Sequence, residues 1–210
     1  MQSALLVRWT PAADAGAPLH DAVRALADDL AMSHAGTVGR VDVVRALDGS
    51  RLYLYLWLRD GAAATEALRD TVRTAVDAAA LPQTGPAEVT RLVPRQDEAG
   101  ASAVEAAPYH YAVELDIDPE HAASMHDWYN TEHLPALAAV PGTVRARRLS
   151  DIDGHPASYA CYDLTSPDTL RSEPWLAVRA TDWSSRMCLL FHTVRRTVFE
   201  RVLTLEPPRP

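Results

Sequence analysis

The hydrophobic positions in the first half of the chain follow two different periods. Residues 18–36 place Leu19, Val23 and Leu26 at helical spacing, and Gly36 follows as a helix stop. Runs rich in valine, leucine and aromatic residues stand on either side, and an Asp-Gly pair between two of them indicates a hairpin. The expected elements are a strand at 4–9, a helix at 18–36, strands at 38–47 and 50–58, a helix at 62–80 and a strand at 87–93.

The second half repeats this order of elements. Asp118 and Pro119 have the form of a helix start, an N-cap residue followed by proline at the first helical position. The Asp-Gly turns at Gly49 and Gly154 lie 105 residues apart, close to the offset of the other elements, which indicates an internal duplication. The expected elements are a strand at 109–117, a helix through 126–142, strands at 143–151 and 157–164, helical material at 166–190 and a strand at 193–203.

Strand-helix-strand-strand-helix-strand is the order of a ferredoxin-like unit, an antiparallel sheet with helices on one face. Within residues 50–58 leucines alternate with Tyr53, Tyr55 and Trp57, so we expect both faces of this strand to be buried. The sequence thus predicts an α+β protein of two tandem ferredoxin-like (βαββαβ) units, with antiparallel sheets packed face to face as a dimeric α/β-barrel. The pattern leaves open whether the barrel closes within one chain or across a homodimer.

A stretch with few large apolar residues separates the two halves. Residues 94–107 carry proline, glycine, serine and acidic side chains, a composition typical of a linker. We therefore expect a degenerate ferredoxin-like repeat at 1–95, a linker at 96–107 and a second repeat, which carries the candidate site, at 108–205.

Composition narrows the classes of partner. The formal net charge of −8 argues against binding to nucleic acid by bulk electrostatics. All 20 basic residues are arginines, so lysine Schiff-base and P-loop chemistry are excluded. Cys161 and Cys188 are expected to be small buried side chains rather than a disulfide framework. The chain shows neither a signal peptide nor an apolar run of membrane-spanning length, so we expect a cytoplasmic protein without a membrane partner.

Residues 126–142, HDWYNTEHLPALAAVPG, concentrate two histidines, a Trp, a Tyr, an Asn and a Glu within eight residues. The part WYNTEHLPALAAVPG resembles a motif of the EthD-like branch of the dimeric α/β-barrel superfamily, in which a W-Y-x-x-E-H-x-P-like run ends the first helix before a V-P-G turn. Residues 172–187, SEPWLAVRATDWSSRM, resemble the second-helix region of the same group. The resemblance covers residues 109–203, whereas the first half shares only the order of elements.

The resemblance implies ferredoxin-like units around an apolar cavity, and it implies several chemistries. Members of the superfamily include cofactor-free quinone-forming monooxygenases, polyketide cyclases, lactone isomerases, haem-degrading enzymes and proteins without an assigned reaction. The architecture is therefore better defined than the reaction.

On a helix, His126, Tyr129, Asn130 and His133 share one face, and the helix should kink or restart at Pro135, two residues after His133. We expect His133 to act as a general acid or base, because imidazole titrates near neutral pH. Tyr129 and Asn130 could then donate hydrogen bonds to an enolate-like oxygen. Further candidates for contact with the substrate are Trp128 and Glu132 on the adjacent face and His110 and His192 in strands.

Each candidate also has a structural interpretation. His133 could be a hydrogen-bonded histidine that ties the helix end to the next strand, and Tyr129 and Trp128 could be core residues. Asn130 and Glu132 could be helix-end hydrogen-bonding groups. No histidine spacing indicates a metal site, and no dinucleotide fingerprint occurs. No cofactor is expected, with haem on His133 or His192 as an alternative, since haem needs a single axial histidine.

These observations favour a cofactor-independent enzyme of the lyase or isomerase type. We expect a cyclase, dehydratase or isomerase that acts on an apolar, aromatic or polyketide-derived small molecule of secondary metabolism. The alternatives are a cofactor-free or haem-dependent monooxygenase on the same fold, and a non-catalytic small-molecule-binding or scaffold protein.

Overall fold

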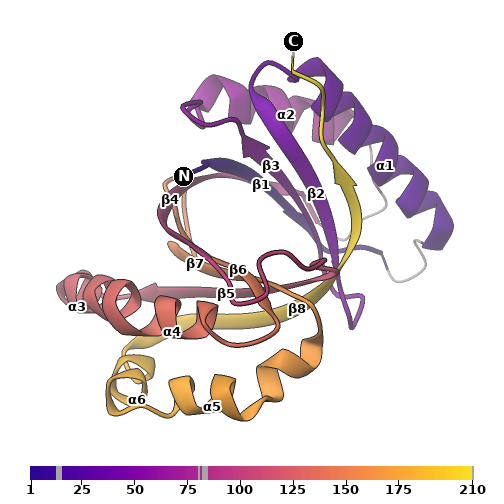
Figure 1. The fold of residues 1–210 in the computed structure, drawn as a ribbon. Coiled ribbons are helices and arrows are strands. Elements are labelled where there is room, and N and C mark those ends of the chain that lie inside the picture. The colour runs from indigo at the N-terminus through magenta and orange to yellow at the C-terminus, as the bar shows by residue number, and fades with distance from the viewer. Residues whose placement is uncertain (13–15, 80, 82–84, 210) are drawn as a thin grey trace. The chain divides into compact units, whose positions relative to one another are not determined.

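A computed structural model describes the chain except for residues 13–15, 80, 82–84 and 210, and except for the side chains of residues 16–18. Contacts divide the chain into two units (Figure 1). The first unit comprises Met1–Val93 together with Glu200–Pro210, and the second comprises Pro94–Phe199. We describe each unit by itself.

The first unit has the predicted order of elements. Its helix α2 begins at Glu66, where Thr65 is the N-cap and its hydroxyl accepts a hydrogen bond from the Leu68 N–H. Residue 80, the last of the helix predicted at 62–80, lies outside the described residues. The elements are β1 (Ala4–Trp9), α1 (Gly16–Ser33), β2 (Val38–Ala46), β3 (Leu52–Leu58) and α2 (Glu66–Ala78), completed by parts of β4 (Glu88–Ala99) and β8 (Phe191–Leu205).

The second unit repeats this order, with its helices divided into shorter pieces. A hydroxyl begins three of these pieces: Ser166 accepts from the Asp168 N–H, Ser172 from the Trp175 N–H and Thr181 from the Ser184 N–H. The helical material expected at 166–190 is therefore divided into three short helices. The elements are β5 (Tyr109–Ile117), η1 (Pro119–His121), α3 (Ala122–Trp128), η2 (Tyr129–His133), α4 (Leu134–Ala138), β6 (Thr143–Asp151), β7 (Ser158–Leu164), η3 (Pro167–Arg171), α5 (Glu173–Arg179) and α6 (Asp182–Cys188).

Strand register shows how closely the two units correspond. In the first unit Ala4 of β1 lies opposite Trp57 of β3, and in the second His110 of β5 lies opposite Asp163 of β7. A register shift occurs after the first residue of both β2 and β6. The hydrogen-bonded strand order β1-β3-β2-β8-β5-β7-β6-β4 is that of a closed barrel. The predicted α+β class of two ferredoxin-like units is therefore confirmed.

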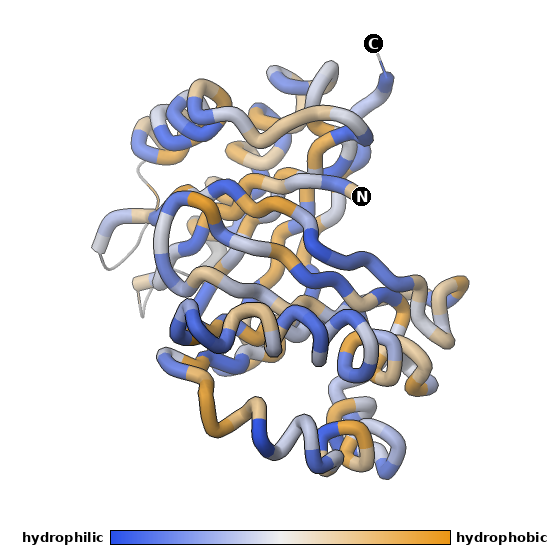
Figure 2. Tube along the Cα trace, turned by 90° about the vertical axis from the view of Figure 1, so that its left-hand side faces the viewer, coloured by the Kyte–Doolittle hydropathy of each residue, from blue (hydrophilic) through white to orange (hydrophobic). Residues whose placement is uncertain are grey.

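Each sheet packs its helices onto one face. Every residue of β3 and every residue of β7 is buried, as predicted for 50–58. Hydrophobic residues run along the strands, whereas the helices alternate between hydrophobic and hydrophilic residues (Figure 2). The core of the first unit includes Leu5, Val7, Leu26, Leu30, Val41, Leu54 and Leu56, and that of the second includes Leu115, Met125, Trp128, Leu134, Leu137, Tyr162 and Trp175.

Strand β4 runs from Glu88 to Ala99 and so includes the beginning of the stretch predicted as a linker. Within that stretch Ser102 is buried, and its hydroxyl oxygen accepts a hydrogen bond from the Gly142 N–H at 3.0 Å. No helix in the described part of the chain is long and apolar enough to cross a membrane.

The turn between α4 and β6 depends on Gly142. Its φ of +94° is a backbone conformation that side chains disfavour, and a Cβ there would lie 2.3 Å from the Thr169 hydroxyl oxygen. The Gly142 carbonyl also accepts a hydrogen bond from the Thr165 N–H at 3.0 Å. Gly142 therefore fixes the entry into β6, which follows the helix that carries the candidate site.

We predict that Gly142→Ala destabilises the protein by about 1–3 kcal/mol, because alanine meets both the backbone strain and the contact with Thr169. Gly154→Ala is the matched control, since no atom lies within 4 Å of a Cβ there and Gly154 has no positive φ. Urea denaturation of both variants measures the difference. Equal midpoints would contradict the assignment.

Candidate active site

The first helix of the second unit is interrupted within residues 126–133, the run rich in histidine and aromatic side chains. Helix α3 ends at Trp128, and the residues Tyr129–His133 form the π-helical turn η2, closed by a hydrogen bond from the Leu134 N–H to the Tyr129 carbonyl. The equivalent helix α1 of the first unit continues from Gly16 to Ser33. Pro135, which has no N–H to donate, follows directly. Single π turns inside α-helices often mark functional sites.

A cavity of about 60 Å³ lies within the second unit, beside this turn. It has the composition of a ligand site, with mostly aromatic and aliphatic walls and a few polar groups. The residues that line it are Tyr111, Val113, Leu115, Trp128, Tyr129, His133, Leu137, Tyr162, Trp175, Arg179, Ser184, Cys188, Phe191 and Arg196.

The contacts of the His133 imidazole determine its tautomer. Ser184 Oγ donates its single hydrogen to the Val178 carbonyl at 2.9 Å and accepts from Trp128 Nε1 at 3.3 Å. His133 Nδ1 lies 3.4 Å from the same oxygen, so Nδ1 must carry the proton for this contact to be a hydrogen bond. Nε2 is then the unprotonated nitrogen. The ring also stacks on Trp128, with centroids 4.0 Å apart.

The His133 imidazole is held in its neutral form. Burial lowers its pKa to about 3, and the positive charge of Arg179 acts in the same direction. The residue is 9% exposed. At neutral pH the free protein therefore presents a proton acceptor at Nε2, and no imidazolium that could act as a general acid.

Three tyrosines, Tyr111, Tyr129 and Tyr162, line the cavity. Burial raises the pKa of Tyr111, Tyr129 and Tyr162, so all three are protonated hydrogen-bond donors at neutral pH. Their hydroxyls have no hydrogen-bond partner among the residues that the structure describes. They are available to an oxygen atom of a ligand.

Arg148 contacts the residues at the π turn from the sheet. Its guanidinium lies 4.4 Å from the centre of the Tyr129 ring, and its Nη1 donates to His126 Nδ1 at 2.9 Å. His126 is half-buried, and burial, followed by the Arg148 charge, lowers its pKa. It does not line the cavity.

The charge of the cavity is positive. Arg179 of α5 and Arg196 of β8 line it, and both are exposed. Neither makes an ion pair with any residue in the described ranges. The lining contains no acidic side chain among the described residues. Two arginines without a carboxylate partner favour an anionic ligand at this mouth.

The structure places four of the predicted site residues away from the cavity. Asn130 is exposed, and Glu132 accepts a hydrogen bond from the Thr181 hydroxyl at 2.7 Å, as a helix-end group does. His192 is exposed and lies 3.4 Å from Asp118. His110 is buried and bonded to Asp163 at 2.9 Å. The cavity thus brings together Trp128, Tyr129 and His133 only.

His110 misses the cavity because residues in a strand alternate between faces. Its neighbour Tyr111 lines the cavity, so the His110 side chain points to the opposite side of the sheet. Asn130 lies in the π turn, whose residues depart from the 3.6-residue period on which the predicted face depended. Sequence reasoning did not assign Arg179, Ser184 or Arg196 to the site, although the first two lie in the stretch that resembles the family's second-helix region.

The cavity must meet two requirements to hold a metal ion or a haem, namely the ligand set and the volume. Among the described residues, no three His, Cys, Asp or Glu side chains gather as metal ligands. His133 Nε2 has the chemistry of an axial haem ligand. The cavity, however, holds about 60 Å³, whereas cofactor pockets occupy about 300–1,000 Å³. His133 could thus serve as a haem ligand, but the cavity as it stands in this structure is smaller than a haem site.

No family model matches the chain, and no curated protein matches it in sequence. Solved structures do match its fold. One is a protein from Fusobacterium nucleatum subsp. nucleatum to which monooxygenase activity is provisionally assigned. It is 10% identical in sequence with a TM-score of 0.67, and the match covers 100% of this chain and 96% of that one.

Two further structures are similar over nearly their whole length. An anthrone oxidase-like protein is 14% identical with a TM-score of 0.66, and the match covers 99% of this chain and 94% of that one. A variant of chlorite dismutase from Candidatus Nitrospira defluvii is 13% identical with a TM-score of 0.62, covering 95% and 90%. Identities this low show a common fold alone. The chain thus has the ferredoxin-like α/β-barrel fold that several enzyme-like proteins use.

Proposed function

We propose that the cavity of the second unit is the active site of a cofactor-independent enzyme that removes a proton from an enolisable carbonyl compound. The observation that carries the proposal is the neutral His133, whose Nδ1 is oriented by Ser184. The WYNTEH run supplies three lining residues, which supports a place in the EthD-like branch.

In this mechanism His133 Nε2 takes the proton from the carbon next to the carbonyl. A low pKa makes the free imidazole a weak base, but the enolate that forms places a negative charge beside the new imidazolium. This ion pair offsets the desolvation that lowers the pKa. The imidazolium then returns the proton as general acid. His133 would be the catalytic residue, and Ser184 a positioning residue.

The enolate oxygen would be stabilised by groups that the cavity leaves without partners. The hydroxyls of Tyr129, Tyr111 and Tyr162 can donate to it, and Arg179 and Arg196 supply positive charge at the mouth. Asn130 has no place in this mechanism, because it lies outside the cavity. The same arginines favour a substrate that carries a carboxylate.

The volume of the cavity limits the reacting end of the substrate. A dry cavity of about 150 Å³ binds benzene, so about 60 Å³ admits a short chain and not an aromatic ring. The expected outcome is an isomerisation, dehydration or cyclisation, in which the enolate is protonated elsewhere, expels a hydroxyl group or attacks a second carbonyl.

Oxygenation of the same carbanion is the second candidate, and the anthrone oxidase-like fold relative favours it. With 2-oxobutanoate as the probe, one atom of O₂ would become a new carbonyl oxygen at C3, and the other would leave as water with the two C3 hydrogens. Uptake of O₂ that depends on His133 would select this reaction.

We predict that the protein exchanges the C3 protons of 2-oxobutanoate with deuterium in D₂O, and that His133→Gln lowers the rate by about 10²–10⁴-fold, because the base is lost. Proton NMR of the substrate measures the exchange. Phenylpyruvate should exchange more slowly, since its ring exceeds the cavity.

His192→Gln is the matched control for this experiment, because His192 is exposed and does not line the cavity. It should leave the exchange rate unchanged. A His133→Gln variant that is folded and retains the wild-type rate would rule out the proposed base. Absence of both deuterium exchange and O₂ uptake with 2-oxobutanoate would favour a binding protein instead.

A second prediction concerns pH. The unfolded chain protonates His133 near 6.5 and the folded chain near 3, so this group's contribution to stability is complete above pH 6.5 and is lost as pH falls toward 3. In ¹⁵N-edited NMR the His133 ring should stay neutral between pH 8 and 5. His155, whose pKa is raised by its hydrogen bond to Asp116, should titrate above 6.5. A His133 midpoint near 6.5 would contradict its burial.

A third prediction tests haem. Because the cavity is too small, added haemin should give no Soret band that depends on His133. Titration followed by visible spectroscopy measures this, with His133→Gln as comparison. A saturable band lost in that variant would show that the cavity opens to haem.

A further inference from the structure

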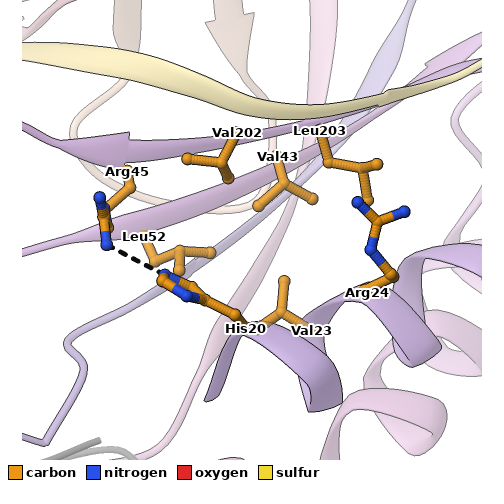
Figure 3. Close-up of a pocket in the computed structure, with 8 residues that line it drawn as sticks. All are labelled: His20, Val23, Arg24, Val43, Arg45, Leu52, Val202 and Leu203. Carbon is orange, nitrogen blue, oxygen red and sulfur yellow. Dashed lines mark hydrogen bonds between the residues drawn. The ribbon is translucent and has the colours of Figure 1, made fainter. Parts of the chain in front are cut away.

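The first unit contains a larger cavity than the second. It holds about 240 Å³ and lies between helix α1 and the strands β2, β3 and β8 (Figure 3). None of its lining residues belongs to the cavity beside His133. Its apolar walls are Val23, Val43, Leu52, Val202 and Leu203.

One side of this cavity is bounded by a hydrogen-bonded pair. Arg45 Nη1 donates to His20 Nε2 at 3.0 Å, so the unprotonated nitrogen of His20 faces the arginine. Arg45 Nε also donates to Glu200 Oε1 at 2.9 Å. The carboxylate of Glu200 therefore balances the charge of Arg45.

Arg24 stands on the opposite side of the apolar residues from Arg45 (Figure 3). It projects from α1 and makes no hydrogen bond or ion pair with any residue that the structure describes. Two arginines and one glutamate leave one net positive charge at the cavity, which is Arg24. One guanidinium without a carboxylate partner, next to apolar walls, favours a ligand that has one negative charge and an apolar group.

The second unit shows why the hollow exists. Strands β2 and β6 have nine residues each, the same burial pattern and a register shift at the same place, so Val43 corresponds to Arg148. In the second unit Arg148 extends beneath the helix to Tyr129 and His126. The shorter Val43 leaves the corresponding space of the first unit open.

We propose that the cavity of the first unit is a binding site for a small aromatic or branched carboxylate of about the size of phenylacetate. A cavity of about 150 Å³ accommodates benzene, so 240 Å³ has room for a ring and a short acid. The ring lies against the apolar walls and the carboxylate pairs with Arg24. The site is separate from the proposed active site and does not depend on its function.

Isothermal titration of the full chain with phenylacetate, 2-phenylethanol and 2-phenylethylammonium tests the charge. Phenylacetate should bind once per chain, more tightly than the alcohol and the ammonium ion. Arg24→Gln should weaken phenylacetate about 10- to 100-fold and leave the alcohol unchanged, because one charged pair is lost. Arg24 is exposed, so this variant should fold.

Two further variants locate the site. Val43→Phe fills the hollow without changing charge and should abolish binding of phenylacetate. Arg179→Gln, in the cavity of the second unit, should leave it unchanged. The proposal is overturned by absence of saturable binding, by an affinity that Arg24→Gln does not lower, or by an affinity that Arg179→Gln lowers as much.

Discussion

The packing of the first helix of each unit onto its sheet determines the rest of the structure. In the first unit α1 is an uninterrupted helix, and Val43 of β2 lies beside it in a core of valine and leucine that also contains Leu56. In the second unit the corresponding core contains Arg148 and Tyr162, which are larger and polar. The helix above them is broken by a π turn. The same fold thus carries a plain helix in one unit and an interrupted helix in the other.

The interruption places polar groups where the fold does not need them. Burial of His133 against Trp128 removes the charge of the imidazole, and Ser184 decides which nitrogen keeps the proton. The tyrosine hydroxyls nearby remain protonated and have no hydrogen-bond partner in the described part of the chain. A neutral base could remove a proton, and several hydrogen-bond donors and two arginines could stabilise the anion that forms. The corresponding helix α1 of the first unit has no such turn.

Arginine side chains line both cavities. The chain carries a net charge of −8, yet each cavity has arginine without a carboxylate partner among the described residues: Arg24 in the first unit and Arg179 and Arg196 in the second. In each unit, local positive charge on an acidic protein favours small anions over nucleic acid. The two proposed sites would select ligands by different properties. Beside His133 the small volume restricts the size of the ligand, and beside Arg24 the positive charge favours an anion.

The sequence by itself determined the order of the elements, the duplication and the α+β class, because hydrophobic period and turn residues are local properties of the chain. It also located the stretch that carries Trp128, Tyr129 and His133. It could not decide which of these side chains share a cavity, since Asn130 lies in a π turn whose residues depart from the helical period on which its face was predicted. Strand alternation likewise turns His110 away while Tyr111 faces inward. Arg179, Ser184 and Arg196 join the site from segments far away in the chain, and only the tertiary structure brings them there.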